Sequence, residues 1–83
     1  LLVIRKEINM EIIIRGLAIK CYTMFKRKAK DVLNRDIYDC DIILNDVENI
    51  KTERDCVIIT FKDLGYSYPV TLFKQDFESI VIM

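Results

Sequence analysis

The chain has 83 residues, with 13 basic and 13 acidic side chains that give a formal net charge of zero. A chain of this length is sufficient for one hydrophobic core and too short for two. Because 52% of the residues are hydrophobic, with only two glycines and one proline, the composition excludes a disordered or linker-like chain. We predict a single α+β domain over residues 1–83.

The distribution of charge and cysteine indicates the compartment. Uncharged stretches such as 16–19 and 21–25 fall far short of the roughly 20 apolar residues that a membrane-spanning helix requires. The three cysteines are odd in number and form no C-x-x-C pair, which favours reduced thiols over disulfides or a zinc site. They are Cys21, Cys40 and Cys56. We therefore expect a cytoplasmic protein that does not bind a membrane.

Residues 1–9 precede the first convincing element, which begins at Met10, and we expect them to be non-native or poorly ordered.

Fourteen residues are isoleucine and only two are alanine. The β-branched side chain of isoleucine favours strands. Abundant Ile, Lys, Asp, Asn and Tyr are also typical of AT-rich coding sequence. This composition suggests a bacterial or phage origin, with the chain as an accessory protein of a phage or mobile element.

The spacing of apolar residues predicts an amphipathic helix over 17–33, because they recur at i, i+3 and i+4. They are Leu17, Cys21, Met24, Phe25, Val32 and Leu33. Cations near the end of this segment favour the negative end of a helix dipole, and Asn34 tolerates a left-handed C-cap.

The start of this helix stays open between Met10 and Leu17. Asn9 could cap a helix beginning at Met10, but such a helix would run about 36 Å in a domain whose expected radius of gyration is about 12 Å. Three consecutive isoleucines and Gly16 instead favour a short strand at 10–15.

After Arg35 the pattern alternates with a period of two, which is typical of strands. Residues 56–61 are apolar on both faces, which predicts a central strand. Gly65 lies where a turn needs positive φ, and Pro69 lies at a strand start or on an edge. The expected architecture is this helix packed on a five-stranded antiparallel sheet or small barrel, with strands at 38–45, 48–53, 56–62, 69–73 and 78–83.

Residues 38–50 resemble residues 68–80 at an offset of 30 positions. Each copy predicts a strand, a tight turn capped by Asp46 or Asp76, an inward Val47 or Phe77, and a second strand. Duplication and recurrent turn chemistry both explain this match.

No catalytic pattern is present. The chain has no histidine, which removes the commonest general base and metal ligand, and it has no Gly-rich phosphate loop. Oxygen ligands for a hard cation could come from one strand face, but exposed carboxylates are usually solvated. They are Asp39, Asp41, Asp46 and Glu48. We predict a non-enzymatic protein without metal or cofactor.

Charge is distributed unevenly. Residues 1–35 contain nine Lys or Arg and three Asp or Glu, a net charge of +6, whereas residues 36–83 contain four and ten, a net charge of −6. The basic residues either cover the acidic sheet within the domain or form a patch for phosphate or nucleic acid, beside Tyr22 and Phe25 as stacking candidates. The patch would comprise Lys26, Arg27, Lys28, Lys30 and Arg35.

The last strand is apolar on both faces, which favours pairing with another chain. Its interface candidates are Ile80, Val81, Ile82 and Met83. We predict a small protein-interaction module that self-associates as a homo-oligomer, with itself or another protein as its partner. The alternative is a nucleic-acid-binding module that uses the basic patch.

A helix followed by five antiparallel strands over about 17–83 resembles the element order of Sm-like domains, which form rings by edge-strand pairing and bind RNA. The family's glycine in the second strand has no counterpart in residues 47–53, and its Arg-Gly pair is replaced by Arg54-Asp55. The resemblance is therefore one of element order alone, and the chain is not identified as a member.

Overall fold

A computed structural model describes residues 9–27 and 39–83 of the chain. These residues form five strands and two short 3-10 helices. In chain order the elements are β1 (Met10–Ala18), η1 (Ile19–Phe25), β2 (Asp39–Thr52), β3 (Cys56–Asp63), β4 (Tyr66–Phe73), η2 (Lys74–Asp76) and β5 (Ser79–Ile82).

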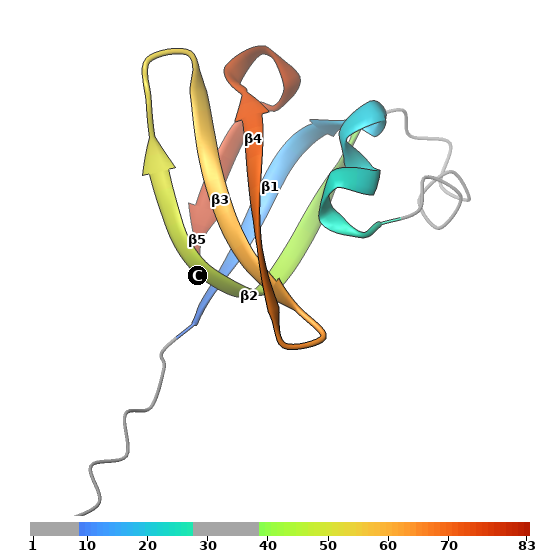
Figure 1. The fold of residues 1–83 in the computed structure, drawn as a ribbon. Helices are drawn as coiled ribbons and strands as arrows, with labels where there is room; N and C mark the ends of the chain where they lie inside the picture. The colour runs from blue at the N-terminus through green and yellow to red at the C-terminus, as the bar shows by residue number, and fades with distance from the viewer. Residues whose placement is uncertain (1–8, 28–38) are drawn as a thin grey trace, which may run out of the picture.

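The strands form one antiparallel sheet in the order β4-β3-β2-β1-β5, which curves around the core and leaves β4 and β5 as its two edges (Figure 1). The domain is therefore mostly β, and the sheet is open. The predicted antiparallel five-stranded sheet is confirmed. The small barrel is wrong, because β4 and β5 do not pair with each other.

The predicted helix over 17–33 is wrong in the part that the structure describes. Residues 10–18 are a strand in which Ile12 and Ile14 are buried and Ile13 is half-buried, the alternation of a strand rather than a helix. A bulge at Arg15 and Gly16 then shifts the side-chain phase by one residue, so that Leu17 also faces the core. The alternative of a strand at 10–15 is thus correct, and the strand continues to Ala18.

Of the described part of this segment, residues 17–27, Ile19–Phe25 are helical and form the 3-10 segment η1. It ends because Lys26 has left-handed backbone dihedral angles, with φ 59° and ψ 29°. Cys21, Tyr22 and Phe25 are buried, so the apolar spacing that suggested a helix does mark a buried face. The rest of the predicted helix, and its cap at Asn34, lie outside the described residues.

The strands predicted at 38–45 and 48–53 are one continuous strand, β2. Val47 pairs with Met10 on one side and with Phe61 on the other, so the backbone is held in the sheet where a turn was expected. A bulge between Val47 and Asn49 in the β2–β3 ladder bends the strand instead. Val47 is nevertheless fully buried, as predicted.

The turn of the β3–β4 hairpin agrees with its prediction, whereas β4 begins at Tyr66, earlier than the predicted start at residue 69. Leu64 and Gly65 form a two-residue connection with φ 50° and 80°, the positive values of a type I′ turn. Val57, Ile59 and Phe61 of β3 are buried while Ile58 is half-buried, so only one face of this strand is fully covered.

Among the described residues, fourteen buried hydrophobic side chains form the core on the concave side of the sheet. At one end η1 contacts both β1 and β4 and closes this side. Phe25 is 1% exposed and its ring centre lies 5.9 Å from that of Phe61. Among the described residues, the short segment η1 therefore does at this end the packing that the longer helix was expected to do.

We expect Gly16→Ala to lower the free energy of unfolding by about 2–4 kcal/mol, from left-handed backbone strain and local overpacking. Gly16 has φ +63°, and an added Cβ would lie 2.6 Å from Glu78 Cγ. Gly65→Ala is the matched control, because Gly65 has φ +80° but no atom within 4 Å of an added Cβ. Chemical denaturation measures both.

Adding Glu78→Ala to Gly16→Ala should recover most of the packing part of this loss, since it removes Cγ and Cδ and keeps Cβ at 3.1 Å, and should leave the backbone part. Equal losses for the two glycine variants would contradict a close contact between Gly16 and Glu78.

Candidate protein interface

The predicted interface residues Ile80, Val81 and Ile82 belong to β5, and Met83 follows directly. β5 pairs antiparallel with β1 in a register that places Ile80 opposite Ile14 and Ile82 opposite Ile12. Because β5 is the last strand in the order, its other edge has no strand beside it in the described sheet.

The backbone groups on that free edge follow from the hydrogen bonds to β1. The Met83 N–H donates to the Glu11 carbonyl oxygen at 2.9 Å. In an antiparallel ladder the residues that bond to a given neighbour alternate along the strand, so Val81 also bonds to β1. The N–H and C=O groups of Ile80 and Ile82 therefore face the free edge.

Apolar side chains remain accessible on both faces of this edge. On the convex face Val81 is 42% exposed, and towards the concave face Ile82 is 62% exposed. Met83 is 62% exposed as well. No residue from Ser79 to Met83 carries a side-chain charge, so the edge lacks the charged residues that usually prevent strand pairing.

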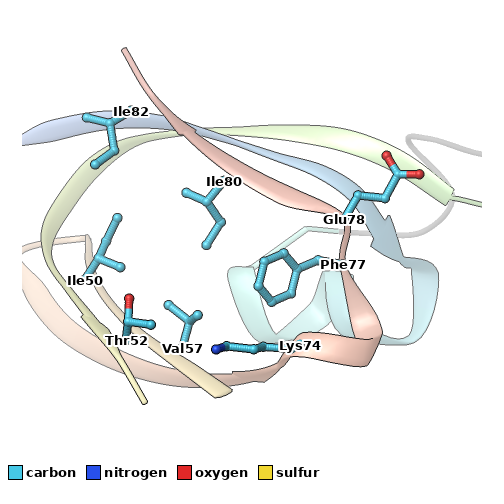
Figure 2. Close-up of a pocket in the computed structure, with 8 residues that line it drawn as sticks. All are labelled: Ile50, Thr52, Val57, Lys74, Phe77, Glu78, Ile80 and Ile82. Carbon is cyan, nitrogen blue, oxygen red and sulfur yellow. The ribbon is translucent and has the colours of Figure 1, made fainter. Parts of the chain in front are cut away.

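A cleft of about 420 Å³ lies beside this edge, between β5 and the ends of β2 and β3 (Figure 2). Its walls are mainly apolar, with Lys74 near Val57 and with Glu78 pointing away from the other side chains. The lining residues are Ile50, Thr52, Val57, Lys74, Phe77, Glu78, Ile80 and Ile82.

The other edge strand, β4, is protected. Tyr66 and Asp63 form the hydrogen-bonded pair that closes the two-residue hairpin. Hydrogen-bonded and non-hydrogen-bonded pairs alternate along the ladder from there, so Pro69 and Thr60 form a pair without mutual hydrogen bonds. The nitrogen of Pro69 therefore faces the free edge of β4, where a proline cannot donate to an added strand. This placement confirms the predicted edge position of Pro69.

The basic patch is described only in part, since Lys28, Lys30 and Arg35 lie outside the described residues. The Lys26 ammonium lies 4.5 Å from the centre of the Tyr68 ring, and Arg27 Nη2 donates to the Ile43 carbonyl oxygen at 2.7 Å.

The two stacking candidates are buried in the core, Tyr22 at 0% and Phe25 at 1% exposure, so they are not accessible to bases. A hollow of about 220 Å³ beside Lys26 and Arg27 is also lined by Asp46 and Asp63. Nucleic-acid binding stays a prediction.

The carboxylates considered as cation ligands have separate partners. Asp41 Oδ1 accepts from the Gly16 N–H at 3.1 Å, Asp46 Oδ1 accepts from Asn9 at 3.5 Å, and Glu48 Oε1 accepts from Ser67 at 2.6 Å. The side chain of Asp39 is not described. Within residues 9–27 and 39–83, no three His, Cys, Asp or Glu side chains are grouped in a way that could hold a metal ion.

Cys21 is buried, and this burial, with a smaller contribution from the Asp76 carboxylate, raises the pKa of its thiol. Cys21 is therefore an unreactive thiol at neutral pH, whereas Cys56 is half-buried.

The predicted turn cap at Asp76 is wrong, because the helix η2 that contains Asp76 has no side-chain cap hydrogen bond. Asp76 instead binds Lys20 at 3.0 Å, an ion pair that joins η1 to η2, and the hydrogen bond raises the pKa of Lys20.

Comparison with protein-family models, with curated proteins and with solved structures finds no match to this chain. Among the residues that the structure describes, no helix has the length and apolar character needed to cross a bilayer. The interface must therefore be judged from its own geometry.

Proposed function

We propose that this chain is a small, non-enzymatic protein-interaction module that self-associates through the free edge of β5. The observation that carries the proposal is an edge strand beside which the described residues place no other strand, with outward-facing backbone groups at Ile80 and Ile82 and exposed apolar side chains on both faces. Strand addition satisfies such backbone groups and buries such side chains in one step.

The contrast between the two edges supports this choice. Pro69 obstructs strand addition at β4, whereas residues 79–83 contain neither proline nor charge. Proteins that stay monomeric usually protect their edge strands against pairing with another chain. Within the described residues, no neighbouring strand, proline or charged side chain protects the edge of β5, which suits this edge to a partner strand.

A second copy of the chain fits this edge because the edge is electrically neutral. Two identical charged strands would repel each other, whereas Ser79–Ile82 can pair with itself at no electrostatic cost. The apolar cleft beside β5 offers space for side chains that the added strand carries.

The test is the mass of the wild-type chain in solution, measured by light scattering at low and high salt. We expect twice the chain mass of 9.8 kDa at both salt concentrations. The proposed contacts are apolar side-chain contacts and backbone hydrogen bonds, and salt screens such contacts only weakly. A monomer at every accessible concentration would rule out self-association.

A further inference from the structure

The outward-facing groups of β5 restrict how two copies can pair. Two residues that lie opposite each other in an antiparallel ladder exchange both backbone hydrogen bonds only if the N–H and C=O groups of both residues point towards the partner strand. On the free edge these residues are Ile80 and Ile82, as the Met83 bond to β1 establishes.

Placing Ile80 opposite Ile82 of the second copy forms two equivalent residue pairs. Every outward-facing N–H and C=O group of Ile80 and Ile82 then has a hydrogen-bond partner. Placing Ile80 opposite Ile80 would instead set Ile82 against Glu78, whose N–H already donates to the Arg15 carbonyl oxygen at 2.8 Å. Placing Ile82 opposite Ile82 pairs only one of the two outward residues of β5 (Ser79–Ile82) in each copy.

We therefore infer that two chains pair their β5 strands antiparallel about a two-fold axis at Val81, with Ile80 of each copy opposite Ile82 of the other. This inference rests on the proposed self-association and specifies its geometry. The contact is isologous, the type that closes as a dimer.

Side chains on both faces agree with this register. On the convex face Ile43, Ile13 and Val81 are successive cross-strand partners, and the two-fold axis joins this row to its copy through the Val81 pair. On the concave side Ile82 of the second copy lies beside Ile80, which lines the apolar cleft.

Disulfide trapping tests the register in a background where Cys40 and Cys56 are replaced by serine. The two Val81 residues would form a pair without mutual hydrogen bonds, with Cα atoms about 4.5 Å apart, which is within disulfide range. Val81→Cys is therefore expected to give a covalent dimer under mild oxidation, with the link at position 81 confirmed by peptide mass spectrometry.

Ser79→Cys is the matched control on the same strand. In this register two Ser79 residues lie about 14 Å apart along the strands, which is four residues at roughly 3.4 Å each, so this variant should not cross-link with itself. A mixture of Ser79→Cys and Met83→Cys chains should cross-link, because these positions oppose each other.

The outcomes separate the register from the proposed function. Self-linking of Ser79→Cys, or a dimer by light scattering that links neither at 81 nor between 79 and 83, overturns the register and leaves self-association standing. A wild-type monomer overturns both, and then the edge is free for a strand from a different protein.

Discussion

Replacing Ile82 with lysine is expected to convert the self-associated protein into a folded monomer. Burying a fully exposed isoleucine side chain stabilises by about 1.5–3 kcal/mol, and because Ile82 is 62% exposed in the single chain, its burial can contribute roughly 1–2 kcal/mol. A symmetric dimer loses this contribution twice, so the association constant should fall by roughly 1.5 to 3 orders of magnitude. Repulsion between the introduced charge and its copy adds to the loss.

The monomer itself should tolerate this change, because Ile82 is 62% exposed in the single chain. Circular dichroism and the unfolding midpoint measured on dilute protein check this expectation. Thr71→Lys is the matched control, since Thr71 is exposed on the other edge strand, β4. Loss of the dimer in both variants would point to general charge repulsion or to an interface elsewhere.

Phe25→Ala is expected to lower the free energy of unfolding by about 3–5 kcal/mol, the usual cost of removing a buried phenylalanine ring. Phe25 is 1% exposed, and it anchors η1 against Phe61 of β3. A small domain has a total stability of roughly 4–12 kcal/mol, so this loss is a large fraction of the total and should lower the urea midpoint of unfolding substantially.

Met24→Ala is the control for this prediction. Met24 precedes Phe25 in the same segment but is 39% exposed, and its truncation should change stability by only about 0.5 kcal/mol. Urea denaturation of both variants gives the comparison. Similar small losses would mean that η1 is not part of the core.

The strands near the C-terminus could be predicted because their information is local. The two-sided apolar run at 56–61, the turn at Gly65 and the position of Pro69 each follow from a few neighbouring residues. The exposed apolar character of Ile82 and Met83 was predictable for the same reason.

The structure of the N-terminal half was harder to predict because the same spacing of apolar residues fits two structures, a helix and a strand followed by a 3-10 segment. Leu17, Cys21 and Phe25 recur at helical spacing, and all three are buried. Leu17 reaches the core from a strand after a bulge, and the other two reach it from a 3-10 turn. Gly16, which has positive φ in the structure, is the residue that marks the bulge, but a glycine at this position also fits the end of a strand before a helix.

The strand order could not be predicted from the sequence, and the cleft depends on it. β1 lies between β2 and β5, and its pairing with β5 joins segments more than sixty residues apart. That pairing brings Ile50, Val57 and Phe77 together beside Ile80. The interface residues were therefore recognisable one by one, whereas the hollow beside them was not.

The most direct measurement is residue-resolved amide hydrogen exchange of the wild-type chain over a dilution series. If β5 pairs with a second copy, exchange at Ile80 and Ile82 is slow in concentrated protein and accelerates on dilution, while Val81, bonded to β1, changes little. Fast exchange at Ile80 and Ile82 that does not depend on concentration would contradict self-association through this edge.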